Sequence, residues 1–578
     1  MMRALLLLVA VCLLAGMSPA CAGQRFPIVA FHDVVDFRGD LDDDAVTVDH
    51  LVGFFEWLRA ERWHPITLDD VDAARRGKKP LPERAILITF DDGYRSVYTR
   101  VFPLLLAYRI PAVFALVGNW LDAPMDATVR YGDRDVPRTR FLGPEEIREM
   151  ARCDLVEFAS HSYDLHEGVI GNPQGSQFPA AYARRYTASH GYESDTAFRR
   201  RITGDLTHSR ELMTKLVGRA PRTIVWPFGR YNGADVEIAK ELGFEFALTL
   251  DPEPADVTKP MALGRFLPTH DPDLATMVSN LRFDDPLPAA HRFVALDPAA
   301  LWTGDAAGTD ERLGHALERL RTLGATDVVI DAAVIVPDRG IAETWFPNGQ
   351  LPVRADLLSR IAWQCQTRAG VKAHVRLPVS EALHTLGDPG KVRALFRDLG
   401  AHVPMSGMFI DDTPGLARVG AGRAIANAPW EIRDARAALD RRLVSSADAL
   451  ALDAFRAVEY WRPGLQLAVV IEPDATPLPS AITDLTFQPI APDARAVERA
   501  AKRMQKGNWL TVPASRRVGL WFTGDRPPDA RDLISATRRF QSLGGTAIGW
   551  ATDDPVRDLP KAKLVTPTVS AATFPVKF

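Results

Sequence analysis

Two neighbouring carboxylates follow a short apolar segment near position 90. Residues 86–90 are rich in β-favouring side chains, and Asp91, Asp92 and Gly93 come directly after them. This pattern predicts a buried strand that delivers both carboxylates to its C-terminal tip, where the glycine allows a sharp turn. Because neighbouring residues on a strand point in opposite directions, the two groups can serve as base and metal ligand. A solvated Asp-Asp-Gly turn is the alternative interpretation of the tripeptide alone.

Two histidines follow a second predicted strand about 70 residues later. Residues 155–160 predict this strand, His161 comes next, and His166 lies five positions further on. A spacing of five does not place two side chains on one helix face, but in a loop both imidazoles can converge. One carboxylate and two imidazoles form a facial ligand set that leaves positions open for water and substrate. The chain has 13 histidines, so this pair is informative only because it follows a second strand tip.

These motifs resemble those of the polysaccharide deacetylases, carbohydrate esterase family four. The segment Thr89-Phe-Asp-Asp-Gly93, together with His161-Ser and His166, carries the resemblance. The resemblance implies that Asp91 is the catalytic base. It also implies that Asp92, His161 and His166 bind one divalent metal ion, which could be Zn, Ni, Co or Fe. The usual family spacing between the two histidines is four, whereas it is five here.

The longer spacing points to the PgaB-like branch, the poly-β-1,6-N-acetylglucosamine N-deacetylases. Residues 26–33 resemble the N-terminal strand of that branch, which implies that His32 is the general acid. Residues 63–70 and 226–232 match two further segments of the branch. Because the acid histidine precedes the Asp-Asp strand, the resemblance implies a circularly permuted (β/α)7-type barrel over roughly residues 26–282.

Amide hydrolysis explains why these residue types are needed. A metal ion polarises the acyl oxygen and lowers the pKa of water. Asp91 would take the proton of the attacking water, and His32 would protonate the departing amine. By resemblance, the backbone N–H of Phe228 would stabilise the tetrahedral oxyanion. The site would therefore combine a base, an acid and an oxyanion donor.

The arginine that orients the base in this family is absent from its usual position. That position lies two residues before the proline of the Trp-Pro-Phe motif, and here it holds Val225. Arg222, Arg230 and Arg265 are candidate replacements, and we favour Arg265. The alternative for each of them is a surface ion pair that contributes little stability.

The first 22 residues have the features of a signal peptide. Arg3 precedes an apolar run that is too short to anchor the chain stably in a bilayer, and Ala20-Cys-Ala22 fits a cleavage site. These features predict a periplasmic protein. Lipidation of Cys21, with anchoring in the outer membrane, is the alternative, although Ser18 stands where a lipobox has a leucine-like residue.

Length and composition predict a two-domain globular protein. The chain has 578 residues, of which 47% are hydrophobic and 25% charged, and this length is too great for a single core. The net charge of −4 and the lack of a basic stripe argue against nucleic acid as a partner. The acidic cluster at residues 40–44 is interpreted as a solvated loop. Cys153 and Cys365 lie one in each predicted domain, so no disulfide framework is expected.

A Pro-rich polar segment at residues 284–290 marks the predicted boundary between the two domains, residues 24–285 and 291–578. Beyond it, alternating strands and helices over about 290 residues predict a (β/α)8 TIM-barrel-like domain. The strand signal is weak after Leu510. Strands are predicted at residues 327–330, 371–377, 408–412 and 467–471, and helices at residues 312–323 and 357–367.

This second half resembles the glycoside-hydrolase-like domain of the same branch. Thr344-Trp-Phe-Pro-Asn348, Asp356 and the strand ending in Asp411 and Asp412 carry the resemblance. Asp411 and Asp412 are candidate functional residues, because glycosidic cleavage needs two carboxylates. Much of the relatives' loop and aromatic material is shortened or replaced, for example by His374-Val-Arg-Leu-Pro378. We therefore expect a barrel that binds polymer with weak or no cleavage, and active hydrolysis is the alternative.

Together, the motifs predict an α/β protein with a deacetylase (β/α)7-type barrel followed by a (β/α)8 barrel. The predicted function is metal-dependent N-deacetylation of exported poly-β-1,6-N-acetylglucosamine, with outer-membrane export machinery as a partner. Deacetylation of chitin-like or peptidoglycan glycans is the alternative within enzymes. A non-catalytic polysaccharide-binding export factor is the alternative outside them, and the complete set of base, ligands and acid histidine argues against it.

Overall fold

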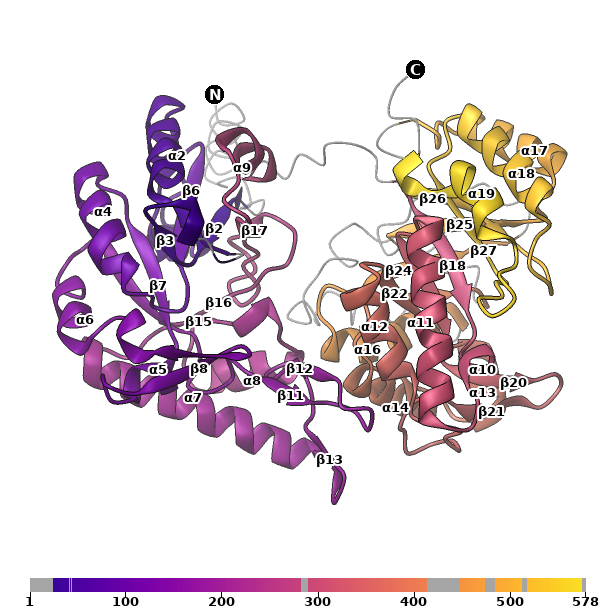
Figure 1. Ribbon diagram of the computed structural model, residues 1–578, viewed down its shortest axis with the longest axis horizontal. Helices are drawn as coiled ribbons and strands as arrows, with labels where there is room; N and C mark the ends of the chain where they lie inside the picture. The colour runs from indigo at the N-terminus through magenta and orange to yellow at the C-terminus, as the bar shows by residue number, and fades with distance from the viewer. Residues whose placement is uncertain are drawn as a thin grey trace, which may run out of the picture. The chain divides into compact units, whose positions relative to one another are not determined.

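The computed structural model describes residues 24–281 except 41 and 43, and residues 290–412, 447–472, 484–511 and 517–573. The predicted signal peptide, including Cys21, lies outside the described residues. The chain forms two compact units (Figure 1). The first comprises residues 1–167, 199–230 and 235–284, and the second comprises residues 168–198, 231–234 and 285–578. None of the helices within the described ranges is long and apolar enough to cross a membrane.

The first unit is built on a parallel sheet of seven strands. Its order is β16-β15-β10-β7-β6-β2, and β5 pairs with β6 outside this path. All six residues of β6 are buried, as expected for a parallel strand with both faces covered. The strands are β2 (Ile28–Phe31), β5 (His64–Pro65), β6 (Ala85–Phe90), β7 (Ala112–Leu116), β10 (Val156–Ser160), β15 (Thr223–Val225) and β16 (Phe246–Leu248).

Alternate side chains of these strands fill two separate cores. Ile86, Ile88 and Phe90 of β6 belong to one buried cluster, whereas Leu87 belongs to the other. This alternation follows from the two-residue period of a strand. Both clusters exclude water from the sheet, so the polar residues that carry chemistry are confined to the strand ends.

A short segment at residues 263–266 joins the two edges of this sheet. Leu263 forms a bridge to Leu248 of β16, and Phe266 forms a bridge to Val29 of β2. The backbone N–H of Ala30 donates to the carbonyl of Phe266 at 2.8 Å, and the N–H of Thr249 donates to that of Leu263 at 2.9 Å. The segment therefore completes a barrel-like ring, as the predicted (β/α)7-type architecture requires, and it carries Arg265 between its two bridges.

Helices and short elements connect the strands of the first unit (Figure 1). Thr47 caps α2 by accepting the N–H of His50, and Thr67 and Asp70 form a capping box at α3. The remaining elements are β1 (Arg25–Phe26), β3 (Val34–Val35), η1 (Arg38–Asp40), β4 (Val46–Thr47), α2 (Val48–Ala60), α3 (Leu68–Arg75), η2 (Val97–Val101), α4 (Phe102–Tyr108), α5 (Gly118–Asp122), β8 (Thr128–Tyr131), β9 (Arg134–Pro137), η3 (Arg138–Arg140), α6 (Pro144–Met150), α7 (Asp195–Val217, which begins in the second unit), η4 (Pro227–Gly229), α8 (Gly233–Glu241), β17 (Ala255–Asp256) and α9 (Leu274–Leu281).

The second unit contains a closed parallel barrel, in the order β18-β19-β22-β23-β24-β25-β26-β27. The predicted (β/α)8 fold is confirmed, including two strands after Leu510 where the sequence signal is weak. The strands are β18 (Arg292–Leu296), β19 (Asp327–Asp331), β22 (Lys372–Arg376), β23 (Gly407–Ile410), β24 (Gln466–Val470), β25 (Leu485–Ile490), β26 (Val518–Phe522) and β27 (Ala547–Trp550).

Large aromatic side chains fill the interior of this barrel. Phe293, Phe409, Phe487 and Trp521 come from four strands and lie in one buried cluster with smaller residues. The ring centroids of Phe409 and Trp521 are 4.5 Å apart. The barrel is therefore a packed core, and any binding surface must lie at its ends.

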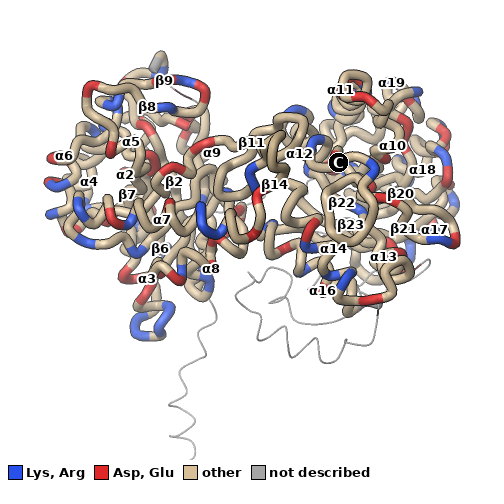
Figure 2. The backbone as a smooth tube through the Cα atoms, turned by 90° about the horizontal axis from the view of Figure 1, so that it is seen from below, with Lys and Arg blue, Asp and Glu red and all other residues tan. Residues whose placement is uncertain are grey.

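Helices surround the barrel, and basic and acidic residues are interspersed along both units (Figures 1 and 2). The helices and remaining elements are α10 (Pro298–Leu301), α11 (Ala306–Leu323), β20 (Ala333–Val336), β21 (Gly340–Thr344), α12 (Leu358–Arg368), α13 (Val379–Leu386), α14 (Pro389–His402), α16 (Ala447–Trp461), α17 (Ala494–Lys506), α18 (Ala530–Ser542), α19 (Ala562–Val569) and η8 (Ala571–Thr573). The helices predicted at residues 312–323 and 357–367 correspond to α11 and α12.

Residues 168–198 belong to the second unit although they precede the predicted domain boundary. Tyr192 donates from its hydroxyl to Asp356 at 2.5 Å, and the ring of Phe178 packs edge-on against Trp363 at 4.8 Å. Residues 168–198, which we call the strap, therefore pack against the barrel segment around Asp356, which carries the resemblance to the branch. The strap contains β11 (Gly168–Ile170), β12 (Gln177–Pro179), β13 (Tyr186–Thr187) and β14 (Gly191–Tyr192).

Candidate metal centre and catalytic site

The predicted site residues of the first unit come together at the C-terminal ends of its parallel strands. Asp91 and Asp92 follow β6, and His161 and His166 follow β10. The two strands are separated in the sheet only by β7, and their carboxyl ends meet at the same edge. Asp91, Asp92 and His161 are buried, so the chemistry sits where a polar edge meets an apolar core.

Strand alternation is the wrong reason for the different directions of the two carboxylates. β6 ends at Phe90, and although the N–H of Asp91 still donates to the carbonyl of Phe31 at 2.8 Å, Asp92 has left the strand. Its φ of 70° lies in the left-handed region, and Gly93 follows at 71°. A non-glycine residue in this region is strained, and such strain is common at functional sites. The turn therefore separates the roles of Asp91 and Asp92.

A tight turn explains how histidines five residues apart converge. Ser162 has a φ of 68°, and its hydroxyl accepts the N–H of Leu165 at 3.1 Å. The carboxylate of Asp205, on α7, accepts the N–H of Tyr163 at 2.9 Å and that of Asp164 at 2.7 Å. These bonds hold the loop in one conformation, which brings the rings of the two histidines to a centroid distance of 5.1 Å.

Three ligand atoms cluster at a spacing that fits a divalent ion. Oδ1 of Asp92 lies 3.4 Å from Nε2 of His161 and 3.3 Å from Nε2 of His166. Ligands about 2.0–2.1 Å from a tetrahedral ion lie about 3.3–3.4 Å from one another. Oδ1 of Asp92 has no hydrogen-bond donor among the described residues, although it is buried. The donor set and the orphaned oxygen both fit a metal ion.

The tautomer of His161 is set by the backbone. Its Nδ1 lies 2.7 Å from the carbonyl of Val225, which can only accept, so Nδ1 carries the hydrogen and Nε2 is free to bind a metal. Val225 thus has a role here through its main chain. Burial raises the pKa of Asp92, but the neighbouring His166 and His161 outweigh burial and hold the pKa well below its ordinary value.

Arg265 forms a two-pronged ion pair with Asp91. Its Nη1 and Nη2 lie 2.8 Å from Oδ1 and Oδ2 of Asp91, and Nη1 also donates to the hydroxyl of Thr89 at 3.0 Å. Burial raises the pKa of Asp91, but the charges of Arg265 and His161 outweigh it and hold the pKa below its ordinary value. Of the three candidate arginines, Arg265 is the one that contacts the carboxylate. Arg222 pairs instead with Glu157 at 2.9 Å and with Asp69 at 2.8 Å, and Arg230 is exposed.

His32 lies beside the ligand cluster, together with an acidic residue that the sequence did not single out. One ligand atom each of His32, Asp44 and Asp92 lie within 4.8 Å of one another. Asp44 is partly buried, and burial raises its pKa while His32 opposes the rise. The interpretation of residues 40–44 as a solvated loop is therefore wrong for Asp44. An isolated acidic run carries no signal that could distinguish this residue from its neighbours.

Phe228 borders the site in a strained conformation. It has a φ of 58°, and its ring lies 4.5 Å from that of His166. Phe228 is 45% exposed, so part of the residue remains open to solvent. The ring thus forms part of the wall of the site, in addition to the backbone N–H that was the expected contribution of this residue.

The candidate carboxylates of the barrel have separate partners. Asp411 follows β23 and accepts from Nη1 of Arg376 at 3.2 Å, and the same guanidinium donates from Nη2 to Asp331 at 2.9 Å. Asp412 instead accepts the N–H and the hydroxyl of Ser380, at 2.6 and 2.5 Å, where α13 begins. Burial raises the pKa of Asp411, and Arg376 opposes the rise. A cation therefore stands between the two acids, Asp331 and Asp411, that face each other across β22.

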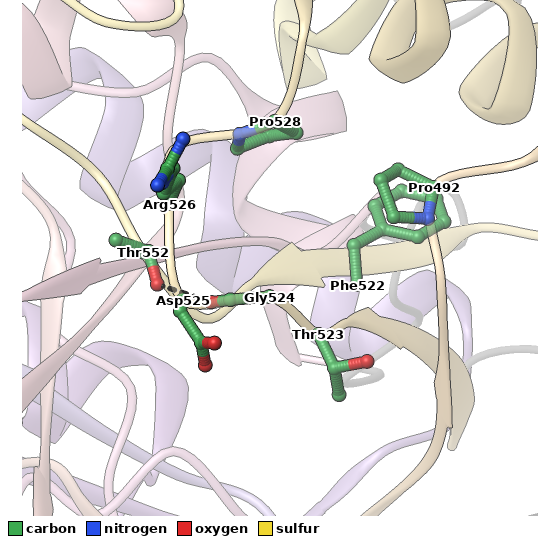
Figure 3. Close-up of a pocket in the computed structure, with 8 residues that line it drawn as sticks. All are labelled: Pro492, Phe522, Thr523, Gly524, Asp525, Arg526, Pro528 and Thr552. Atoms are coloured by element: carbon green, nitrogen blue, oxygen red, sulfur yellow. Dashed lines mark hydrogen bonds between the residues drawn. The ribbon is translucent and has the colours of Figure 1, made fainter.

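A pocket of about 470 Å³ lies at the same end of the barrel. Figure 3 shows its residues at the end of β26 and on the loops that follow β25, β26 and β27. Asp525 supplies a carboxylate and Arg526 a guanidinium, whereas Phe522 is buried in the core of the barrel domain. The hydroxyl of Thr552 donates to the carbonyl of Gly524 at 2.6 Å and ties two of the loops together. The exposed part of this lining is therefore mainly polar.

Comparison with known proteins agrees with the geometry of the first unit. The family described as polysaccharide deacetylase matches residues 78–247, which include Asp91, Asp92, His161 and His166. The poly-β-1,6-N-acetyl-D-glucosamine N-deacetylase of Escherichia coli (strain K12) is 35% identical over 359 residues, which are 61% of this chain and 53% of that protein. The deacetylase domain of BpsB from Bordetella bronchiseptica is 38% identical over 43% of this chain and 97% of that domain, with a TM-score of 0.38. The chain belongs to the polysaccharide deacetylase family.

Further matches concern the second unit and a second deacetylase. The de-N-acetylase of Aggregatibacter actinomycetemcomitans is 33% identical over 45% of this chain and all of that chain, with a TM-score of 0.43. The family described as hypothetical glycosyl hydrolase family 13 matches residues 294–385 of this deacetylase-family chain. The chain spans about half the length of the curated Escherichia coli relative that it matches.

Tyr131 is a further residue of the site that sequence reasoning missed. Its hydroxyl donates to Oδ2 of Asp92 at 3.0 Å, from a hairpin that lies between α5 and α6. No local pattern marks this tyrosine, because a single aromatic residue in a short hairpin is usually a packing residue. Its position became evident only from the folded chain.

Proposed function

We propose that this chain is a metal-dependent polysaccharide N-deacetylase that acts on poly-β-1,6-N-acetylglucosamine. The observation that carries the proposal is the buried pair of Arg265 and Asp91 beside the ligand cluster of Asp92, His161 and His166. Burying a base in a two-pronged ion pair beside three metal ligands is costly in desolvation, and simpler residues could fill the same space at lower cost. The arrangement is therefore explained by chemistry and not by stability. The substrate is inferred from the names of the relatives, and the arrangement supports the reaction.

Asp91 would act as the general base. Its low pKa keeps it ionised, and the fork of Arg265 fixes both of its oxygens, so the carboxylate is held ready to accept a proton from water. His32 would donate a proton to the departing amine, and the backbone N–H of Phe228 would donate to the developing oxyanion. Each of these residues therefore has one task, and none has to change its role during the reaction.

Asp92, His161 and His166 would hold the divalent ion. The chemistry that such an ion supplies is Lewis-acid polarisation of the amide and a lower pKa for water. Two imidazoles and a single carboxylate suit Zn, Ni, Co and Fe alike, because these ions share a preference for nitrogen and oxygen ligands. The backbone carbonyl of Val225 keeps His161 in the tautomer that can bind.

The proposed setting is the periplasm, where the exported polymer would meet the enzyme and the outer-membrane export machinery. The expectation of a signal peptide in residues 1–22 supports this location, and lipidation at Cys21 is the alternative to simple cleavage. Cell fractionation with an antibody against the chain, and mass spectrometry of its mature N-terminus, would test both points. Recovery of the protein in the cytoplasm with its first residues intact would contradict them.

Acetate release tests the catalytic proposal directly. The full chain is incubated with β-1,6-linked N-acetylglucosamine oligomers, with chitin oligomers and with peptidoglycan fragments, each with and without chelator. We expect acetate from the β-1,6-linked oligomers, no release after chelation, and recovery on adding back a divalent ion. Preferred release of acetate from chitin oligomers or peptidoglycan fragments would show that the preferred substrate is that glycan. No release from any of them would overturn the enzymatic function in favour of a binding protein.

We propose that the barrel binds the partly deacetylated polymer and does not cleave it efficiently. Arg376 occupies the space between Asp331 and Asp411, where a hydrolase needs two free carboxyl groups about 5–9.5 Å apart. Asp412 is engaged by Ser380. Following polymer length during incubation with the full chain tests this, and shortening that disappears in Asp411→Asn would show a working hydrolase.

A further inference from the structure

Tyr131 projects from a hairpin that is firmly anchored in the first unit. Strands β8 and β9 pair so that Tyr131 lies opposite Arg134, and Gly132, with a φ of 59°, helps to form the two-residue connection. At the base of the hairpin, the fully buried guanidinium of Arg138 donates to the carbonyls of Leu121, Phe141 and Leu142. These bonds fix the hairpin against the body of the unit, so its tip holds a defined position over the site.

The two oxygens of Asp92 face different partners. Oδ1 faces Nε2 of His161 and of His166, at 3.4 and 3.3 Å. Oδ2 faces the hydroxyl of Tyr131, which donates to it at 3.0 Å. The same hydroxyl lies 3.5 Å from Asp44, at the limit of a hydrogen bond. Because a phenol has one hydrogen, the shorter contact identifies Asp92 as its acceptor.

The ring of Tyr131 is packed so that its hydroxyl cannot easily turn away. Its centroid lies 5.3 Å from Trp120, 5.9 Å from Tyr94 and 6.2 Å from His166. Aromatic contacts of this kind stabilise the ring in one position beyond the area that they bury. The donor is therefore held in place by the packing of its ring.

We propose that Tyr131 is a positioning residue for the metal ligand Asp92. By donating to Oδ2, its hydroxyl reserves Oδ1 for the divalent ion and prevents the carboxylate from rotating to offer both oxygens. The inference rests on the metal-dependent function proposed above and extends it to a residue outside the ligand set. Carboxylates that bind metals are commonly held by such hydrogen bonds, and loss of one weakens metal affinity or activity by roughly 10–100-fold.

Tyr131→Phe removes the hydroxyl and keeps the packed ring. The matched control is Tyr98→Phe, because the hydroxyl of Tyr98 donates to the carboxylate of Glu149 at 2.8 Å on an exposed surface. The full chain is stripped of metal, and Zn²⁺ affinity is measured by competition with a chromophoric chelator. Co²⁺ is then added, and its visible spectrum is recorded, since the band intensity falls as the coordination number rises. Thermal unfolding of the metal-free protein is measured in parallel.

We expect Tyr131→Phe to bind Zn²⁺ about 10–100-fold more weakly than the wild type. The Co²⁺ bands should weaken and shift, because Asp92 becomes free to bind through both oxygens. The metal-free unfolding temperature should stay within a few degrees of the wild type, and Tyr98→Phe should change neither affinity nor spectrum.

Two results would overturn the inference while leaving the proposed function intact. One is a Tyr131→Phe protein with the affinity and the Co²⁺ spectrum of the wild type. The other is a metal-free variant that fails to fold or unfolds at a much lower temperature, since this would make the hydroxyl a general structural group. A wild-type chain that binds neither ion would instead refute the metal-dependent function itself.

Discussion

Replacing Arg265 would test the catalytic site most directly. The side chains of Arg265 and Asp91 are 1% and 3% exposed, and the guanidinium also donates to Thr89 and to the carbonyl of Thr249. Arg265→Met would leave the charge of Asp91 buried without its partner. Removing one partner of a buried ion pair costs about 3–5 kcal/mol, because the remaining charge loses its compensation. In a unit of this size, that cost lowers the unfolding temperature by roughly 6–20 °C.

Arg222→Met is the matched control within the same unit. Arg222 forms the same two-pronged pair, with Glu157, but these two side chains are 28% and 20% exposed. Solvent screens such a pair, and we expect a cost of about 0–1 kcal/mol. Both variants lose one guanidinium and one two-pronged ion pair. The difference between their losses of stability and activity therefore reports the effects of burial and of contact with the base.

Differential scanning calorimetry and acetate release are the two assays. Turnover of Arg265→Met should fall by on the order of 100-fold, because Asp91 is no longer held in place. The turnover of Arg265→Lys should lie between those of the wild type and Arg265→Met, since a lysine keeps the charge but cannot form the two-pronged ion pair. The double variant Asp91→Asn with Arg265→Met should be more stable than the sum of the single losses implies. Equal losses in Arg265→Met and Arg222→Met, or strict additivity in the double variant, would refute the reasoning.

Three further predictions concern other residues. Asp92→Asn should lose bound metal and activity together, whereas Asp91→Asn should keep the metal and lose most turnover; metal analysis of both variants would show whether these roles are reversed. His32→Ala should keep the metal and lower kcat more than KM, because leaving-group protonation is removed, and a change confined to KM would argue for a binding role. In the barrel, burial raises the pKa of Asp327, but hydrogen bonds with His291 and His374 outweigh it and hold the pKa below its ordinary range. Because the folded-state pKa is lowered, the stabilisation is fully present above about pH 4 and is lost as the pH falls below it. Unfolding temperatures from pH 7 to pH 3 should therefore fall more steeply for the wild type than for Asp327→Asn, and parallel curves would contradict this.

Much of the strand framework follows from local sequence. A run such as residues 86–90 is apolar except for Thr89, because a parallel strand is buried on both faces, and the run is too short for a typical helix. Residues 156–160 and the first strands of the barrel are recognisable for the same reason. A ligand set of one carboxylate with His161 and His166 could be predicted because these residues follow such strands, and the resemblance to the family singled out Asp92. Because the ends of neighbouring parallel strands meet at one edge of the sheet, a position directly after a strand is enough to predict that a residue lies near the site.

The sequence misled where the conformation of single residues mattered. Asp92 is on a left-handed turn, and Asp44 lies beside His32, although an acidic cluster usually stays in solvent. Backbone dihedral angles at non-glycine residues are not encoded in residue type, because the surrounding structure has to impose them. The sequence allowed histidines five residues apart to converge in a loop, and the turn at Ser162 is the conformation that brings them together.

Long-range partners depended entirely on tertiary structure. Arg265 is 174 positions from Asp91, and Tyr131 is 39 positions from Asp92. The first meets its partner because residues 263–266 close the ring between β16 and β2, and the second because a hairpin is anchored over the strand ends. Likewise, residues 168–198 pack in the second unit although they lie far before the predicted boundary. The sequence by itself determined which residues can do chemistry and which strands carry them. Which polar groups hold those residues in place was decided by closure of the sheet and by packing, because these depend on contacts between segments whose separation along the chain carries no periodic signal.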